Sequence, residues 1–181
     1  MPRKAFTPMN ERPTIICDSR EQKWQHVKNV FDDNGILWIR SKLPVGDYTR
    51  LDNMSTIVDR KADLNEVESN LVHQHDRFRA ECELAQKHGI RLVILIEVGT
   101  CRKLDDVKNW INPRRKRWER LDRAHAEGKL LSHKIPSRPP VDGMQLFAIM
   151  RTMNEKYGVE WEFCQPKRTG ERICQILGVQ L

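Results

Sequence analysis

Two aspartates and a lysine lie close together in the first third of the sequence, in a pattern that suits phosphodiester hydrolysis. Asp47 follows Gly46, and twelve residues later Asp59 precedes Lys61 with one residue between them. Carboxylate oxygens are the ligands that Mg²⁺ prefers in proteins. A cation of this kind polarises a phosphate oxygen and acidifies a water, and a lysine can orient or deprotonate that water. Asp47 and Asp59 are therefore candidate metal ligands, and Lys61 is a candidate catalytic residue.

A β-hairpin would bring these three side chains together. Residues 48–51 and 56–61 have strand character, and the residues between them are typical of a turn. Alternate side chains of a strand point to the same face, so Asp59 and Lys61 share a face. If the two strands pair, the start of the first lies beside the end of the second. The pattern therefore predicts that Asp47 lies next to Asp59 and Lys61.

A second polar group follows the first apolar run of the chain. Residues 14–17 predict a buried strand, and Asp18 and Arg20 come directly after it. In α/β proteins, sites gather at the carboxyl ends of strands. The same stretch also fits a strand-to-helix turn, because Ser19 and Gln22 have the spacing of a capping box. Both interpretations are open.

The remaining pattern is typical of a mixed α/β domain. A helix is expected over residues 22–33, and the polar segment 62–88 reads as one helix or two. The continuous apolar run 92–96 predicts a strand covered on both faces at the centre of the sheet. Glu97 follows it and either reaches the site or marks where the strand meets solvent. The other expected elements are a strand at 36–39, a helix at 142–157, a strand at 159–164 and a helix at 170–177.

Residues 98–140 break this pattern and predict a basic helical insertion. Helices are expected at 105–110 and 118–126, separated by a proline. Basic side chains between two tryptophans suit contact with a nucleic-acid backbone, and a solvated helix face is the alternative. The basic residues are Arg114, Arg115, Lys116 and Arg117.

Composition favours an anionic partner and gives no sign of a membrane or zinc protein. The 181 residues include 32 Lys and Arg against 25 Asp and Glu, a formal charge of +7. The five cysteines contain no Cys-x-x-Cys pair, which predicts reduced thiols in an intracellular, cytoplasmic protein. No segment reaches the roughly 18 apolar residues of a membrane helix. Residues 1–12 are expected to be a flexible tail, and residues 13–181 a single domain that includes the insertion.

Three segments resemble, in order and spacing, the nuclease domain of the XPF family. They are residues 16–21 (ICDSRE), 43–48 (LPVGDY) and 57–61 (IVDRK). The family pattern is G-D-x(n)-E-R-K-x(3)-D, on the restriction-endonuclease-like PD-(D/E)XK fold. Arg77, Phe78 and Glu81, the strand up to Glu97 and residues 157–178 are similar as well. The resemblance implies an α/β fold with a mixed sheet flanked by helices. It further implies a metal-dependent DNA endonuclease of the free-standing bacterial or phage type, acting in repair or recombination.

Position by position, the resemblance gives each residue of the site a role. The implied catalytic set is Asp18, Arg20, Asp47, Asp59, Arg60 and Lys61. Asp47 and Asp59 would hold Mg²⁺ or Mn²⁺, and Lys61 would orient the water. Arg20 and Arg60 would contact phosphate or fix the carboxylates, since an arginine fork fits either anion. DNA contact is expected from Arg77. If the protein is a nuclease, it is also expected from Arg114, Arg115, Lys116 and Arg117 of the insertion, which itself matches nothing diagnostic of the family.

The chain departs from the family pattern at two positions. Asp59 replaces the usual glutamate, which keeps the charge and shortens the reach by one methylene. Asn65 stands at the place of the last aspartate, which leaves Asp63 and Glu66 as substitutes.

The expected partner is DNA, and the assembly is open between a monomer, a homodimer and a complex with a partner subunit. The alternative to an enzyme is a catalytically inactive DNA-binding module of the same fold. Such modules usually lose the carboxylates or the lysine, whereas this chain keeps Asp47, Asp59 and Lys61. An enzyme that acts on RNA is a third interpretation.

Overall fold

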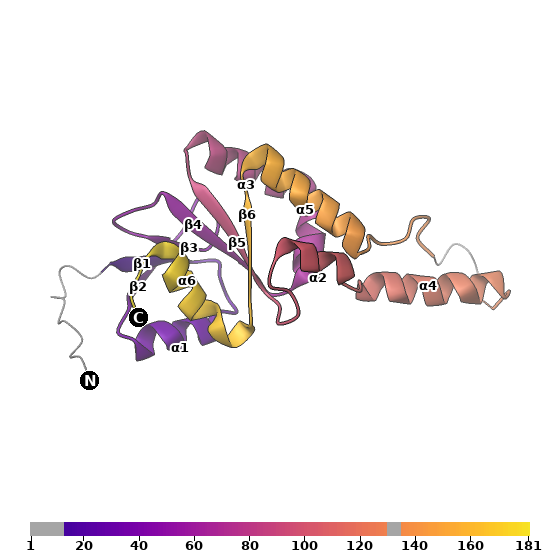
Figure 1. The fold of residues 1–181 in the computed structure, drawn as a ribbon, viewed down its shortest axis with the longest axis horizontal. Helices are drawn as coiled ribbons and strands as arrows, with labels where there is room; N and C mark the ends of the chain where they lie inside the picture. Colours follow the sequence, from indigo (N-terminus) through magenta and orange to yellow (C-terminus); the bar gives the residue numbers. More distant parts are fainter. Residues whose placement is uncertain (1–12, 130–134) are drawn as a thin grey trace.

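The computed structural model describes residues 13–129 and 135–181, which form a mixed six-stranded sheet with helices on both faces (Figure 1). The expected tail at residues 1–12 lies outside the described residues. The strand order is β2-β1-β3-β4-β5-β6. The strands are β1 (Thr14–Asp18), β2 (Leu37–Ser41), β3 (Tyr48–Arg50), β4 (Thr56–Lys61), β5 (Arg91–Glu97) and β6 (Glu160–Cys164). The predicted α/β class with a mixed sheet is confirmed.

Pairing directions explain why the carboxyl ends of several strands meet at one edge. β3 is antiparallel to both β1 and β4, as the predicted hairpin requires, and Tyr48 pairs with Val58. β4, β5 and β6 run parallel to one another. The carboxyl ends of these three strands therefore share an edge, and the start of β3 adjoins the end of β4.

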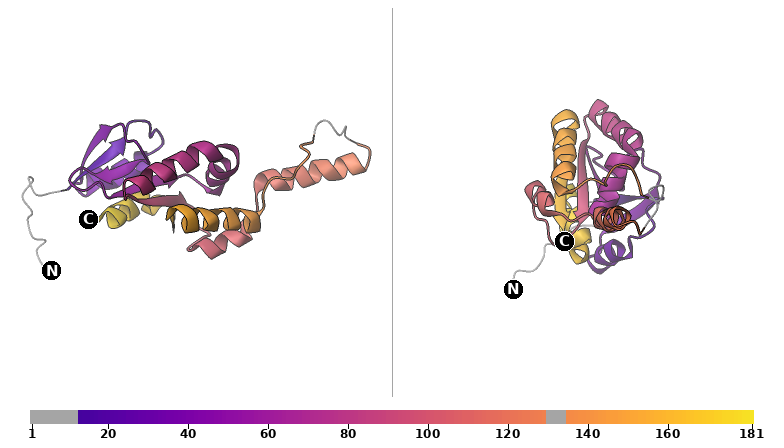
Figure 2. Two further views of the ribbon diagram at one scale, coloured as in Figure 1. Left: turned by 90° about the horizontal axis from the view of Figure 1, so that it is seen from above. Right: turned by 90° about the vertical axis from the view of Figure 1, so that its right-hand side faces the viewer.

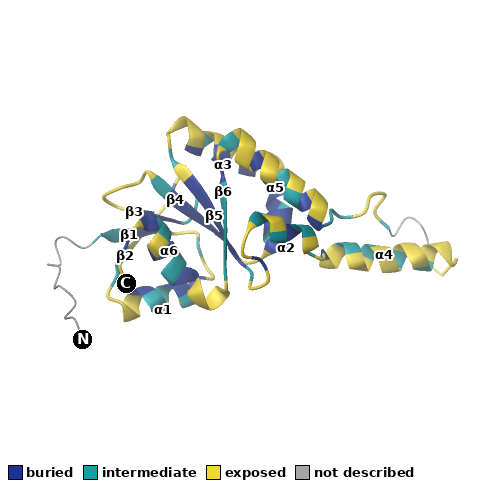
Figure 3. Cartoon of the chain, viewed as in Figure 1, coloured by how far each residue is buried: buried dark blue, intermediate teal, exposed yellow. Residues whose placement is uncertain are grey.

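Alternation along the strands builds two cores, one on each face of the sheet. Ile57, Ile94 and Ile96 pack under the helices α2 (Leu64–Glu68), α3 (His75–Lys87) and α5 (Gly143–Tyr157). Val58 and Leu95 pack on the other face under α1 (Gln25–Asp33) and α6 (Thr169–Leu177). Because both faces are covered, β5 is apolar from Leu92 to Ile96 without interruption, and Figure 3 shows it largely buried.

The apolar run of β5 is covered on both faces as predicted, but its expected position at the sheet centre is wrong. β5 is the fifth of six strands, since only β6 lies beyond it. The capping-box interpretation is also wrong. Helix α1 begins at Gln25 after Trp24, which makes no side-chain cap. Arg40 instead binds the carbonyl oxygens of Ser19 and Glu21, which holds the residues before α1 in a loop.

The segment predicted as one or two helices is two, because α2 and α3 are joined by a π-helical turn, η2 (Ser69–His73). In the insertion, a 3₁₀ helix, η3 (Leu104–Asn109), precedes α4 (Pro113–Ala126). Helix α4 begins five residues earlier than predicted, since the Asn112 side chain caps it and a proline fits the first helical position. It has no buried residue and projects from the body (Figures 1 and 2).

Another short 3₁₀ helix, η5 (Pro166–Arg168), joins β6 to α6.

The cysteines at positions 17, 82, 101, 164 and 174 are all free thiols. No helix among the described residues is long and apolar enough to cross a membrane.

Candidate active site

A cleft of about 500 Å³ opens where the end of β4 meets the start of β3 and the loop after β1. Its walls carry acidic and basic side chains in nearly equal number. The lining residues are Asp18, Arg20, Glu21, Gln22, Lys23, Gly46, Asp47, Asp59, Arg60, Lys61, Ala62, Glu66, Arg77 and Glu81. The six residues of the implied catalytic set all lie on this one cleft.

Asp47 is fixed by the hairpin backbone. Its N–H donates to the Val58 carbonyl over 2.9 Å, and its Oδ2 accepts the N–H of Arg60 over 2.8 Å. Gly46 before it has φ +60°, and a Cβ there would lie 2.6 Å from Cγ2 of Ile57. A larger residue would therefore displace Asp47. Burial, with the added charge of Asp59, raises the pKa of Asp47 well above the usual carboxyl range.

Asp59 and Lys61 form a buried ion pair on the same face of β4. Lys61 Nζ lies 2.9 Å from Oδ1 and 2.8 Å from Oδ2 of Asp59, and both side chains are less than a tenth exposed. Burial alone would lower the pKa of Lys61. The charge and hydrogen bond of Asp59 outweigh burial and raise it, so Lys61 is an ammonium ion at neutral pH.

Asp18 lines the cleft, but its oxygens are already occupied by protein donors. Oδ1 accepts the backbone N–H and Nε of Arg20 at 2.7 and 2.9 Å, and Oδ2 accepts Arg20 Nη2 and the Leu43 N–H at 3.0 and 2.7 Å. Burial opposes ionisation, yet these hydrogen bonds lower the pKa of Asp18. Asp18 is therefore placed to anchor Arg20 and the loop that leads to Asp47.

The Arg60 side chain points away from Asp47 and Asp59, as alternation along β4 requires. Its Nη1 lies 2.9 Å from Glu97 and its Nη2 lies 3.0 Å from Glu21. Glu97 also accepts from Thr169 at 2.7 Å and lies 2.5 Å from Nε2 of His26. The side chain of Arg60 thus fixes Glu21 and Glu97, and Glu97 belongs to this buried network on the opposite face from Asp59.

Asn65, which stands where the XPF pattern has its last aspartate, and the two possible substitutes Asp63 and Glu66 differ in whether they reach the cleft. Asp63 caps α2, accepting the N–H of Glu66 at 2.8 Å and the Asn65 side chain at 3.0 Å. Glu66 accepts the Ala62 N–H at 2.8 Å and also lines the cleft. Asn65 and Asp63 do not line it.

Glu81 is a further cleft carboxylate that the residue pattern alone did not single out for a role. It comes from α3, and burial followed by the charge of Asp59 raises its pKa. Glu81 forms no hydrogen bond or ion pair through its side chain with any of the described residues. The spacing of apolar residues in α3 could have indicated Glu81. It lies three residues after buried Phe78 and four before buried Ala85, at the edge of the buried face of the helix. Arg77 is exposed one turn before it on the same cleft.

The four basic residues of the insertion divide into two anchored and two free side chains. Arg114 Nη1 binds buried Glu68 at 2.8 Å, and Arg115 lies 3.3 Å from Asp142. Lys116 and Arg117 are exposed and form no ion pair with any described residue. The flanking tryptophans are also engaged, because Trp110 packs on the core and Trp118 donates to the Pro136 carbonyl at 2.9 Å.

Comparison with known proteins places the fold. No family model matches the chain, and no curated protein matches it in sequence. The structure of XPF from Aeropyrum pernix in complex with DNA is similar to this chain, with a TM-score of 0.56 and 21% identity over 92% of it. Another structure of XPF from Aeropyrum pernix gives a TM-score of 0.57 and 22% identity over 91%.

This chain spans less than two thirds of those XPF chains, 64% and 63% respectively. Identity at this level shows a shared fold. The mixed six-stranded sheet with its helices therefore has the fold of an XPF nuclease.

Proposed function

We propose, from the fold that this chain shares with an archaeal XPF, that it is a metal-dependent DNA endonuclease that hydrolyses phosphodiester bonds. The observation that carries the proposal is the convergence of Asp47, Asp59 and Lys61 on one cleft. Exposed Arg20 and Arg77 at the same cleft add positive charge for a polyanionic strand.

The donor chemistry fits Mg²⁺ or Mn²⁺. The residues available at the cleft centre, Asp47 and Asp59, offer only carboxylate oxygens, and Glu81 adds a third carboxylate from α3. No group of three or more His, Cys, Asp or Glu side chains within residues 13–129 and 135–181 could hold an ion alone. Mg²⁺ is usually held by one or two carboxylates together with waters and substrate phosphates. When bound, such a cation supplies polarisation of a phosphate oxygen and a water of lowered pKa.

Lys61 has a role that follows from its protonation state. As an ammonium ion held by Asp59, it can donate hydrogen bonds to the attacking water or to a phosphate oxygen. In hydrolysis the water oxygen forms a bond to phosphorus and the water gives up a proton, the bond to the leaving deoxyribose oxygen breaks, and that oxygen takes up a proton. The positive charge of Lys61 stabilises the negative charge that develops on the phosphate in this step.

The finer expectations remain parts of the proposal. These are action on branched or structured DNA, a role in repair or recombination, a bacterial or phage-like source, an intracellular location, and residues 13–181 as one nuclease domain. Assembly as a homodimer or with a partner subunit is also part of the proposal.

The test is cleavage of labelled duplex, flap and fork DNA with Mg²⁺ or Mn²⁺. We expect Asp47→Asn, Asp59→Asn and Lys61→Met each to lower the cleavage rate by about 100-fold or more, because each removes a charge at the reacting phosphate. Asp52→Asn is the matched control, since this exposed aspartate lies in the turn between β3 and β4.

Three outcomes would contradict this assignment. Cleavage that persists in all three variants would place the chemistry elsewhere. Tight DNA binding by the wild type without cleavage of any substrate would favour the inactive DNA-binding module, and preferential cleavage of RNA would favour the RNA-directed enzyme.

A further inference from the structure

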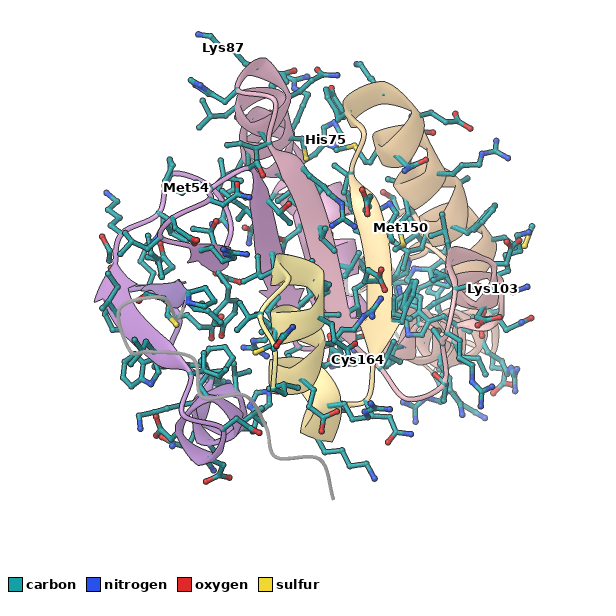
Figure 4. The ribbon with its side chains drawn as sticks, turned by 60° about the vertical axis from the view of Figure 1, so that its left-hand side comes forward. Met54, His75, Lys87, Lys103, Met150 and Cys164 are labelled. Carbon is teal, nitrogen blue, oxygen red and sulfur yellow. The ribbon has the colours of Figure 1, made fainter. Side chains whose placement is uncertain are left out.

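A second hollow, of about 490 Å³, lies beyond the cleft at the ends of β5 and β6. Its walls include four cationic side chains and no acidic one: Arg102, Lys167, Arg168 and Arg172. Cys164, which also lines it, lies at the end of β6 near the start of α6 (Figure 4). We call these four cationic residues and the hollow between them the basic pocket. The catalytic cleft, by contrast, has acidic and basic residues mixed in its walls.

Two of the four cations in the basic pocket lack a compensating charge. Arg168 lies 3.0 Å from Glu171, and Arg172 lies 2.8 Å from Glu162. Arg102 and Lys167 are exposed and form no ion pair with any residue of the described ranges. The pocket therefore carries a surplus of about two positive charges, which favours an anionic group.

Strand register places the basic pocket at the same edge of the sheet as the catalytic cleft. Lys61 of β4 pairs with Ile96 of β5, and Ile96 pairs with Phe163 of β6. Lys61 lines the cleft and Phe163 lines the pocket. Neighbouring strands are about 4.8 Å apart, so these two residues are separated by roughly 10 Å along the sheet edge. That separation is short enough for one nucleic-acid strand to reach both places.

Glu97, a carboxylate that lies between the two places, does not repel such a strand strongly. Glu97 ends β5 between Lys61 and Cys164, but its oxygens are occupied by Arg60, Thr169 and His26. Its side chain is only 7% exposed. The path from the cleft to the basic pocket therefore carries no free negative charge from Glu97.

We propose that the basic pocket binds a backbone phosphate of the same strand that is cut in the cleft, within a few nucleotides of the scissile bond. This range follows from the backbone separation of roughly 10 Å, because consecutive phosphates of one strand lie farther apart than the axial rise of about 3.4 Å per nucleotide. The inference rests on the proposed nuclease function and adds a second contact point to it. The pocket would set where along a strand the cleft engages, without reading bases.

The first test measures DNA affinity without cleavage, in EDTA, as a function of salt. We expect the double variant Arg102→Gln/Lys167→Gln to bind several-fold more weakly, with a salt slope smaller by about 0.7–0.9 because one phosphate is no longer neutralised. The matched control is Lys87→Gln/Lys156→Gln, which removes the same charge. Lys87 lies at the end of the molecule opposite Cys164, and the Lys156 carbonyl accepts from Gln86 next to it (Figure 4). Equal salt slopes for the two double variants would overturn the inference.

The second test locates the contact. A neutral methylphosphonate is placed at each linkage in turn, and affinity is compared between wild type and the Arg102→Gln/Lys167→Gln variant. We expect one linkage, within a few nucleotides of the cut, whose neutralisation weakens the wild type but leaves the variant unchanged. A variant that is as sensitive as the wild type at every linkage would overturn the inference.

The outcomes separate this inference from the function on which it rests. If the wild type neither binds nor cuts nucleic acid, the proposed function and the inference both fail. If the wild type binds and cuts but the two tests show no effect of the pocket, only the inference fails. If inorganic phosphate raises the melting temperature of the wild type but not of the variant, and DNA affinity is equal, the pocket is a free-anion site and the inference is overturned.

Discussion

The backbone N–H of Arg60 donates to Oδ2 of Asp47 over 2.8 Å, while the Arg60 side chain pairs with Glu21 and Glu97 on the other face of β4. One residue thus links the cleft carboxylate and the buried network through two different groups. The position of Asp47 depends on the hairpin backbone, which a change in the Arg60 side chain leaves in place. The electrostatic state of Asp47, in contrast, depends on side chains that only the fold brings near.

Asp47→Asn should make the metal-free protein more stable at neutral pH. The raised pKa of Asp47 means that the folded state holds this proton more tightly than the unfolded state. Stability therefore falls as the pH rises from the ordinary value of 3.8 through the folded-state pKa. Asparagine removes the charge and can still accept the Arg60 N–H. We expect a higher melting temperature for the variant at pH 7 in EDTA.

The same comparison has two internal controls. The difference in melting temperature should vanish well below pH 3.8, where Asp47 is protonated in both the folded and the unfolded state, and should shrink when Mn²⁺ is added to the wild type. A variant that is less stable than the wild type at pH 7 in EDTA would contradict the electrostatic account.

Asp18→Asn should have the opposite effect, with a loss of about 1–3 kcal/mol of stability at pH 7 from weakened charge-assisted hydrogen bonds. The lowered pKa of Asp18 means that its contribution is fully present above the ordinary value of 3.8 and is lost as the pH falls through the folded-state pKa. Denaturant unfolding at pH 7 and at pH 3 measures the loss of stability in the variant above and below this ordinary pKa. An equal loss at both pH values would show that Asp18 acts through shape and not through charge.

Glu81→Gln should weaken Mn²⁺ binding by about tenfold, a typical loss when a group supporting a metal site is removed. The reason is that Glu81 faces the cleft and senses the charge of Asp59. Calorimetric titration with Mn²⁺ alone gives the affinity without any cleavage assay. Glu83→Gln is the control, since Glu83 is exposed on the same helix and lies near Arg79. Equal affinities for the two variants would remove Glu81 from the site.

The basic residues of α4 should differ in what they contribute. Lys116→Gln with Arg117→Gln should reduce the salt slope of DNA binding by up to about 2 if both touch phosphates, with little change in stability. Arg114→Gln should instead cost about 1–3 kcal/mol, because it leaves the buried Glu68 carboxylate with a weaker partner. Fluorescence anisotropy and denaturant unfolding distinguish the two effects. An unchanged salt slope in the double variant would mean that these two residues form a solvated face.

The local geometry of the site could be predicted because it depends on short stretches of chain. The Asp59 and Lys61 side chains share a face through strand alternation alone, and the hairpin brings Asp47 beside them. The two cores likewise follow from apolar runs whose period is that of strands and helices. The start of α4 also had a local signal, since a proline after Asn112 fits the first turn of a helix.

Contacts between distant segments could not be predicted, because hydrophobic periodicity says which face is buried but not what lies against it. Asp18 follows a strand where a site residue would be expected, yet Arg20 and the Leu43 N–H occupy its oxygens. Glu97 ends another apolar strand in the same manner and is taken up by Arg60 and Thr169.

The sequence by itself determined the class of the fold and the three side chains at the centre of the candidate site. Tertiary structure decided which other carboxylates remain available, since a carboxylate's chemistry depends on donors that arrive from far along the chain. It left Glu81 without such a donor among the described residues and set Phe163 in register with Lys61, two strands away. Register is a property of the assembled sheet. The position of the basic pocket relative to the cleft could therefore be found only from the folded chain.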